Sequence, residues 1–206
     1  QAKSTYGTGC FVISNTGSEP VRSAQQLLST VAYRLGGEVT YGLEGSIFVA
    51  GAAIKWLRDQ LGLIRDTQDT SDAFQATGGD TGGVFVVPAF TGLGAPHWQP
   101  DARGLITGLT LDTSREQIVT AFLQAVVFQT EELLQAMSKD GATISRLRVD
   151  GGMAVNDELC QFLADLLDVV VERPKDVETT ARGAAILAAL GAGIFPDINQ
   201  VAVVWA

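Results

Sequence analysis

Histidine and cysteine are scarce in this sequence. Among its 206 residues, His97 is the single histidine, and Cys10 and Cys160 are the two cysteines. This scarcity excludes zinc sites built from paired cysteines and histidines, and it excludes a disulfide framework. A Ser-His-Asp triad would depend on one histidine with no nucleophile-elbow motif beside it. We expect two unpaired, partly buried thiols in a reducing cytoplasm.

Basic residues are also few. The chain has 14 Lys and Arg residues against 23 Asp and Glu residues, a formal net charge of -9. Nucleic acids and anionic membrane surfaces both require a positive patch, so neither is expected as a main partner. No run of about 18 apolar residues predicts a membrane span. Any bound phosphate must therefore be held mainly by backbone N–H groups.

Two familiar nucleotide-binding signatures are missing as well. Neither the Walker A pattern nor GxGxxG occurs, so a nucleotide would be bound by a different architecture. Residues 1–5 lack the basic and apolar regions of a secretory signal. Because the sequence also lacks an initiator Met, we interpret it as a piece of a longer protein.

Apolar residues, in contrast, are plentiful enough for a substantial core. They make up 46% of the chain, and charged residues 18%. Strand-like segments separated by glycine turns come first, and helical and strand-like segments alternate after them. This order predicts one α/β domain over residues 1–206, with a mixed β-sheet flanked by helices.

The hydrophobic patterns and the capping residues predict individual elements. Ser114 and Gln117 form a capping-box pattern that opens the clearest helix, which ends near Gly141. Asn156 is expected to cap another helix, and Thr179 to open an alanine-rich one ending at residue 191 or 193. A helix over 47–61 and a short helix within 65–80 are also predicted. The expected strands flank a turn at 7–9 and cover 27–35, 39–43, 84–87, 147–149 and 169–171, of which 84–87 is expected to be buried.

The first segment of chemical interest is the turn Gly7-Thr8-Gly9. Its glycines would let backbone N–H groups approach an anion closely, and the Thr8 hydroxyl would add a donor. An ordinary hairpin turn uses the same residues. By itself this segment therefore favours the hairpin.

The second segment runs from Asp150 through Gly151 and Gly152 to Asn156. A strand, a Gly-Gly turn and a helix N-terminus form a recurrent way of placing a nucleotide, because the helix dipole and the free N–H groups face it. An ordinary strand-to-helix connection explains the same residues equally well.

The third segment contains Gly51 and Lys55. Glycine inside a helix costs about 1 kcal/mol relative to alanine, so Gly51 should have a steric reason. Either another helix packs there, which is the commoner cause, or a flat ligand such as a purine does. Lys55, one turn later, is by itself more typical of a solvated surface than of a ligand site.

Taken together, five segments resemble the glycerol kinases of the FGGY carbohydrate kinase family. They are, in sequence order, Tyr6-Gly-Thr-Gly-Cys-Phe11, Leu43-Glu-Gly-Ser-Ile-Phe-Val-Ala-Gly-Ala-Ala-Ile54, Pro88-Ala-Phe-Thr-Gly-Leu-Gly-Ala-Pro96, Asp101-Ala-Arg-Gly104 and Val149-Asp-Gly-Gly152 with Asn156. The resemblance covers nearly the whole chain. It implies the carboxy-terminal, nucleotide-binding lobe of a two-lobed kinase, with a ribonuclease-H-like and actin-like ATPase fold.

The resemblance also implies roles for six residues. Thr8 would contact the β- and γ-phosphates of ATP, and Gly51 and Lys55 would line the purine. Gly152 and Asn156 would form the adenosine turn. Phe11 would provide an apolar wall for the glycerol carbons. Glutamine is usual in the family where Lys55 stands, so this contact is altered here.

The same resemblance assigns the remaining chemistry to a part that precedes Gln1. The general base is an aspartate of the amino-terminal lobe, so this chain is expected to hold no catalytic residue and no metal ligand. Mg²⁺ is expected to be held mainly by ATP. The implied activity is the conversion of glycerol and ATP to glycerol 3-phosphate and ADP, with this fragment inactive alone. A homo-oligomer, a kinase for another polyol or sugar, and a non-catalytic nucleotide-binding module stay open as alternatives.

Overall fold

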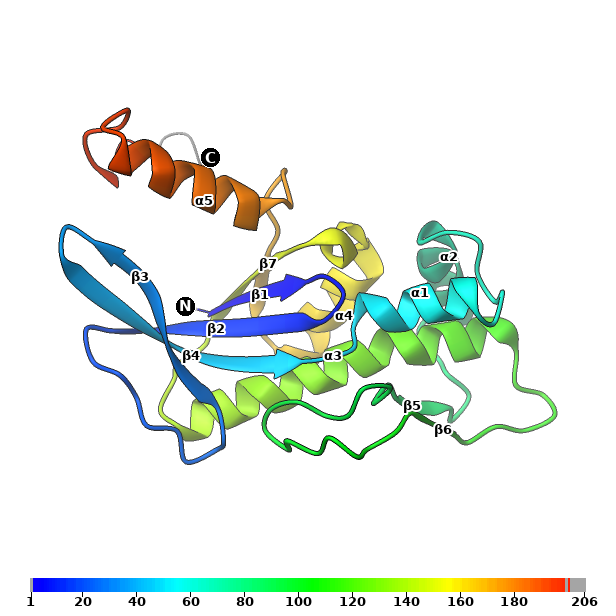
Figure 1. Ribbon diagram of the computed structural model, residues 1–206. Coiled ribbons are helices and arrows are strands. Elements are labelled where there is room, and N and C mark those ends of the chain that lie inside the picture. The colour runs from blue at the N-terminus through cyan, green and yellow to red at the C-terminus, as the bar shows by residue number, and fades with distance from the viewer. Residues whose placement is uncertain (1, 199, 201–206) are drawn as a thin grey trace.

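The computed structural model describes residues 2–198 and 200; residues 1, 199 and 201–206 lie outside the described part. A six-stranded sheet forms its centre (Figure 1). Its strands are β1 (Ala2–Tyr6), β2 (Cys10–Gly17), β3 (Leu28–Leu35), β4 (Glu38–Ile47), β7 (Arg146–Asp150) and β8 (Val170–Glu172). The strand order is β3-β4-β2-β1-β7-β8.

The sheet is mixed, as the order of elements predicted. The first four strands pair antiparallel, while β7 pairs parallel to both β1 and β8. Parallel neighbours require crossover connections. A separate antiparallel ribbon is formed by β5 (Phe85–Val87) and β6 (Leu105–Thr107).

Helices lie on both sides of the sheet. They are α1 (Gly51–Asp59), α2 (Gln68–Thr77), α3 (Arg115–Lys139), α4 (Asp157–Leu167), α5 (Thr179–Gly191) and a 3₁₀ turn at Gly152–Val155. The 3₁₀ turn and α4 connect β7 to β8, whereas the connection from β1 to β7 contains β2–β6 as well as α1, α2 and α3. In Figure 1, the long green helix α3 runs along one side of the sheet and the orange helix α5 lies on the other. The predicted capping box opens α3: the Ser114 side chain accepts from Gln117 N, and the Gln117 side chain accepts from Ser114 N.

Two hydrophobic cores share α3. The sheet core lies between the central strands and helices α3 and α4, and includes Tyr6, Val12, Leu43, Leu133, Leu147 and Leu163. The helical core lies between α1, α2, α3 and β5, and includes Ala53, Leu57, Ala73, Val86 and Phe122. The partly buried Met153 packs against both cores.

The predicted start of the first helix is wrong. Residue 47 ends β4, opposite Cys10 of β2, and α1 begins only at Gly51. The apolar run after residue 47 fits a strand end as well as a helix start. Pairing with β2 decides between them, and local periodicity does not report that pairing.

The strand predicted at 84–87 exists but is not buried throughout. Phe85 is 57% exposed and Val87 39% exposed, whereas Val84 and Val86 are buried. The reason is that β5 pairs only with β6 at the surface, so one face of the ribbon meets solvent.

Candidate functional site

The turn at Gly7-Thr8-Gly9 is held by the first turn of α1. The N–H groups of Ala50 and Ala52 both donate to the Thr8 carbonyl at 3.0 Å, and the Gly51 N–H donates to the Gly7 carbonyl at 2.9 Å. The first N–H groups of a helix have no partner within the helix. Here they bind the hairpin, which fixes the hairpin against α1 and leaves the Thr8 side chain exposed.

Close backbone contacts explain two glycines of this region. A Cβ on Gly9 would lie 2.6 Å from the Ile47 carbonyl oxygen, and a Cβ on Gly51 would lie 2.5 Å from the Gly7 carbonyl oxygen. Gly51 is therefore not in a helix interior, and its steric reason is the hairpin backbone rather than a second helix.

A close backbone contact also explains a glycine in the turn after β7. Gly151 has a φ of +87°, and a Cβ there would clash with the Tyr6 carbonyl oxygen. Its N–H donates to the Val177 carbonyl at 3.0 Å. Around Gly152, by contrast, a Cβ would meet no described atom within 4 Å, so this residue faces open space.

Asp150, immediately before the turn, is almost fully buried. One of its carboxylate oxygens, Oδ2, lies 2.7 Å from the Lys3 ammonium and accepts from the Thr179 hydroxyl. The other, Oδ1, has no hydrogen-bond partner among the described residues. These contacts tie the start of α5 to the glycine turn, so Asp150 has a structural reason for its position.

Asn156 caps α4, as predicted, and also binds α2. Its Oδ1 accepts from Leu159 N at 2.9 Å, and its Nδ2 donates to Thr70 Oγ1 at 2.9 Å. The Thr70 hydroxyl donates in turn to the Thr67 carbonyl at 2.6 Å. The side chain of Asn156 is thus held from two sides.

A cavity of about 310 Å³ opens between α1, α2 and the turn after β7. Four of the six predicted site residues, Gly51, Lys55, Gly152 and Asn156, line it. Its other walls include Ile54, Arg58, Thr70, Leu123 and Met153. A larger cavity of about 740 Å³ lies beside α5 and is lined by none of the six. The smaller cavity is therefore the candidate nucleotide site.

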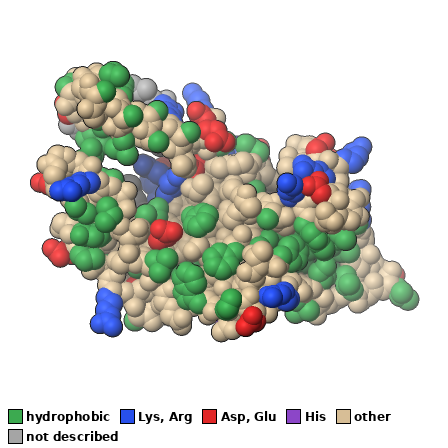
Figure 2. All heavy atoms as spheres, in the orientation of Figure 1, with side chains coloured by type: hydrophobic (Ala, Val, Ile, Leu, Met, Phe, Trp, Pro, Cys, Tyr) green, Lys and Arg blue, Asp and Glu red, His purple; other side chains and the backbone are tan. Residues whose placement is uncertain are grey.

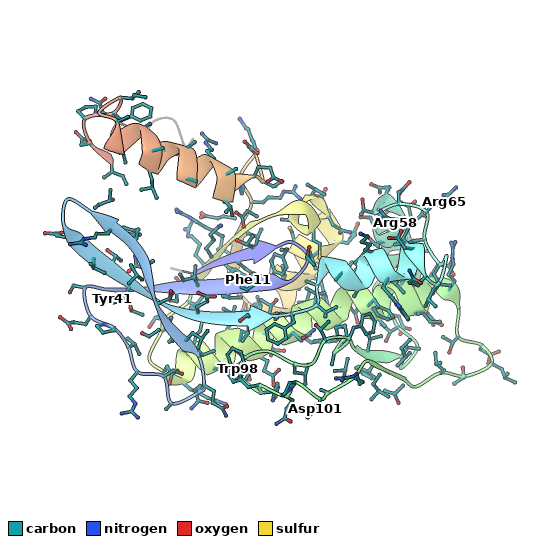
Figure 3. All side chains as sticks on the ribbon, viewed as in Figure 1. Phe11, Tyr41, Arg58, Arg65, Trp98 and Asp101 are labelled. Carbon is teal, nitrogen blue, oxygen red and sulfur yellow. The ribbon has the colours of Figure 1, made fainter. Side chains whose placement is uncertain are left out.

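The other two predicted residues lie outside that cavity. Thr8 follows Gly7, whose carbonyl accepts from the N–H of the cavity residue Gly51, and its own carbonyl accepts from the N–H groups of Ala50 and Ala52 on either side of Gly51. Phe11 lies on β2, is 50% exposed, and stands apart from α1 and α2 in Figure 3. The structure thus brings four of the predicted residues together, sets Thr8 beside them, and keeps Phe11 on the sheet.

Charged side chains surround this end of the molecule in pairs of opposite sign. Figure 2 shows basic and acidic groups interspersed over α1 and α2. Arg58 lies 2.7 Å from Asp59, and Arg65 lies 3.1 Å from Asp69 (Figure 3 labels both arginines). Hydrogen bonds from Arg65 lower the pKa of Asp69 to about 2. Because two of the arginines are paired, the rim is not a uniformly positive surface.

Two cavity residues on α2, Thr70 and Ser71, were missed by sequence reasoning. Both are buried, although they lie in a segment that reads as polar and mixed. Neither belongs to a glycine turn or to an apolar stripe. A signal for them exists only in space, where α2 packs against α3 and α4.

Comparison with known proteins shows the family to which this chain belongs. The sequence profile of the "FGGY family of carbohydrate kinases, C-terminal domain" matches residues 2–192. The chain belongs to the FGGY family of carbohydrate kinases. The predicted resemblance to the carboxy-terminal part of this family is confirmed.

Curated FGGY relatives agree closely in sequence. The chain is 59% identical over 204 residues to a glycerol kinase of Marinomonas sp. strain MWYL1 and 58% identical over 203 residues to glycerol kinase 1 of Pseudomonas aeruginosa. Each match covers 98% of this chain and 41% of the relative. This FGGY chain therefore spans less than half the length of these relatives.

Solved FGGY structures share the fold. A crystal structure of Plasmodium falciparum glycerol kinase with ADP matches with a TM-score of 0.87 and 39% identity, over 99% of this chain and 41% of that one. A xylulose kinase from Lactobacillus acidophilus matches with a TM-score of 0.81 and 20% identity, over 97% of this chain and 40% of that one, which bears on the fold alone. The predicted fold class, an actin-like α/β lobe with a mixed sheet flanked by helices, is confirmed. No helix in the described part of this FGGY chain is long and apolar enough to cross a bilayer.

Proposed function

We propose that this chain is the ATP-binding lobe of an ATP:glycerol 3-phosphotransferase. One observation carries the proposal: residues from α1 and from the turn after β7, far apart in the sequence, line one cavity. The 59% identity to a glycerol kinase supports glycerol as the acceptor. Because ATP is the proposed donor, the proposed location of the enzyme is the cytoplasm.

In this proposal the nucleotide lies with its purine and ribose in the 310 Å³ cavity. Gly51 and Lys55 line the purine, and Gly152 and Asn156 form the turn at the adenosine. The open space around Gly152 leaves room for a ligand group, since a Cβ there would meet no described atom within 4 Å. Thr8 reaches the β- and γ-phosphates from the adjoining hairpin, together with N–H groups of its turn.

The chemistry requires a second lobe, amino-terminal to this chain. An aspartate of that lobe takes the proton from a terminal glycerol hydroxyl, the hydroxyl oxygen bonds to the γ-phosphorus, and the bond to the ADP oxygen breaks. Phe11, exposed on β2, offers an apolar wall for the glycerol carbons. Positioning and electrostatic stabilisation supply most of the catalysis in reactions of this kind.

Mg²⁺, when bound, neutralises charge on the transferred phosphoryl group. The described residues contain no group of three His, Cys, Asp or Glu side chains arranged to hold a metal ion. The Thr8 hydroxyl and the hairpin N–H groups are donors suited to phosphate. Such a site fits a cation whose ligands are mainly the phosphates of ATP.

Calorimetric titration of this chain with ADP and with ATP tests the nucleotide site. We expect weak binding of both nucleotides and no phosphorylation of glycerol by the chain alone. Turnover with glycerol would contradict the assignment of the base to the other lobe. Absence of nucleotide binding would contradict the cavity assignment.

Thr8→Ala in the two-lobed kinase tests the phosphate contact. We expect KM for ATP to rise and kcat to fall, with little change in glycerol binding. Thr16→Ala is the matched control, because this residue lies at the far end of β2 and its hydroxyl donates to the nearby Glu19 carbonyl. Unchanged ATP kinetics in Thr8→Ala would overturn the role given to Thr8, and a panel of polyols would test the acceptor.

A further inference from the structure

The side-chain amide of Asn156 has a fixed direction in this structure. Its oxygen is occupied by the N–H of Leu159 at the start of α4, and its nitrogen donates to Thr70 Oγ1. An amide rotated by half a turn would place its NH₂ group against the Leu159 N–H, where an acceptor is required. The cap therefore favours one orientation.

Thr70 adds a second constraint. A threonine hydroxyl carries one hydrogen, and that of Thr70 goes to the Thr67 carbonyl at 2.6 Å. Toward Asn156 the hydroxyl can then act only as an acceptor, which requires Nδ2 and not Oδ1 to face it. Thr70 is 2% exposed, so water does not replace this partner easily.

An amide nitrogen has two hydrogens, and Thr70 accepts one of them. The second hydrogen of Asn156 Nδ2 has no acceptor among the described residues, and Asn156 lines the cavity. An N–H of fixed direction is thereby left for a ligand atom that accepts a hydrogen bond.

We propose that Thr70 is a positioning residue of the nucleotide site, which holds the Asn156 amide so that it offers an N–H donor to an acceptor atom on the nucleoside. The proposal rests on the proposed function, because it assumes that the cavity binds a nucleotide. It adds a residue on α2 to a site otherwise built from α1, the hairpin and the turn after β7. The ribose oxygens and the ring nitrogens of a purine are acceptors of the required kind.

Helix α2 offers a matched control for a purely structural role. Thr77 also donates its hydroxyl to the carbonyl three residues earlier, Phe74, and is within hydrogen-bond distance of a second side chain, Thr120. Thr77 does not line the cavity. Replacing either threonine by valine removes a hydroxyl that bonds a helix carbonyl and a second side chain, and at Thr77 it also removes the acceptor of the Gly79 N–H.

The experiment measures ADP dissociation constants and urea unfolding of the whole chain for three variants. We expect Thr70→Val to weaken ADP binding about tenfold. Without the Thr70 hydroxyl, one N–H of the Asn156 amide loses its acceptor and the amide is no longer held in the direction that serves the nucleoside. Thr70→Ser keeps the hydroxyl and should bind ADP as the parent chain does. Thr77→Val should lose at least as much stability and bind ADP unchanged.

A fourth variant, at Asn156, keeps the proposal testable even if Thr70→Val does not fold. Asn156→Asp preserves an oxygen for the helix cap, and aspartate caps helices about as well as asparagine. It removes both N–H donors. We expect a folded chain with weaker ADP binding, and in that background the further change Thr70→Val should weaken binding by less than about twofold.

The outcomes separate this proposal from the proposed function. If the parent chain binds no ADP, the proposed function fails and this proposal fails with it. If the parent binds ADP and either Thr70→Val or Asn156→Asp binds it equally well, the positioning role is wrong while the nucleotide site stands. A similar loss of ADP binding in Thr77→Val would also overturn the positioning role.

Discussion

The Gly51 N–H donates to the Gly7 carbonyl oxygen at 2.9 Å, and a Cβ on Gly51 would lie 2.5 Å from that same oxygen. Hydrogen bonding and steric exclusion therefore act at one contact. It joins the start of α1 to the hairpin that carries Thr8. The proposed phosphate contact and the proposed purine wall thus depend on one backbone junction.

Gly51→Ala is predicted to destabilise the fold and to weaken ADP binding. The added methyl group must push the hairpin backbone away, and overpacking of this kind costs about 1–3 kcal/mol. Urea unfolding and calorimetric titration measure the two effects. Gly183→Ala is the control: it lies inside α5 with open space around its Cβ, so it should stabilise the chain by about 0.5–1 kcal/mol. Equal stability of Gly51→Ala and the parent would contradict the close contact.

Gly152→Ala is predicted to separate binding from stability. Its Cβ would meet no described atom within 4 Å, so the free energy of unfolding should change by less than about 0.5 kcal/mol. The methyl group would protrude into the cavity that Gly152 lines, and ADP binding should weaken. A variant that binds ADP like the parent would show that no ligand group approaches this residue.

Cys10 is predicted to be unreactive in the folded chain. It is fully buried, its Sγ lies 3.1 Å from Ser4 Oγ, and burial raises its pKa to about 12. A thiol reagent at neutral pH should therefore leave it unmodified until urea unfolds the chain, because the thiolate is the reacting form. Mass spectrometry of the labelled peptides would locate the modified residue, and rapid labelling of Cys10 without urea would contradict its burial.

The same pKa predicts a loss of stability at alkaline pH. In the unfolded chain a cysteine releases its proton near pH 8.5, whereas folded Cys10 keeps it until about pH 12. Above pH 8.5 the unfolded state therefore binds fewer protons, so the free energy of unfolding falls as pH rises, by up to about 1.4 kcal/mol per pH unit. Burial also raises the pKa of Tyr6, which adds to this fall above about pH 10. Urea unfolding of Cys10→Ala should show a flatter slope between about pH 8.5 and 10, and an unchanged slope would count against the shift.

Ser114→Ala is predicted to cost about 1 kcal/mol of stability, because it removes the acceptor for the Gln117 N–H at the start of α3. The control is Ser138→Ala in the last turn of the same helix, where the side chain is exposed and alanine is the better helix former. This control should be neutral or slightly stabilising in urea. Equal effects of both substitutions would show that the cap contributes nothing.

Local signals predicted some of these elements correctly. The start of α3 follows from Ser114 and Gln117, because a capping box involves only residues within one turn. The cap at Asn156 is equally local. The start of α1 and the exposure of β5 were predicted wrongly, since pairing with β2 and β6 decides them.

The candidate site likewise contains residues that the local sequence predicts and residues that it does not. Its glycine turns are readable in the sequence, because few residues other than glycine tolerate such conformations and contacts. Thr70 is not readable, because its hydrogen-bond partner Asn156 lies 86 residues further along the chain. No pattern within α2 distinguishes this threonine from one that faces solvent.

Helix α3 contributes to both cores: Leu123 and Val126 belong to the sheet core, while Phe122 and Ala125 belong to the helical core. A helix shared in this way cannot melt on one side and persist on the other, so heating should produce a single calorimetric peak. The 310 Å³ cavity lies at the junction, with Leu123 and Met153 in its wall. A nucleotide bound there would therefore raise the midpoint of the whole transition rather than protect one half of the molecule.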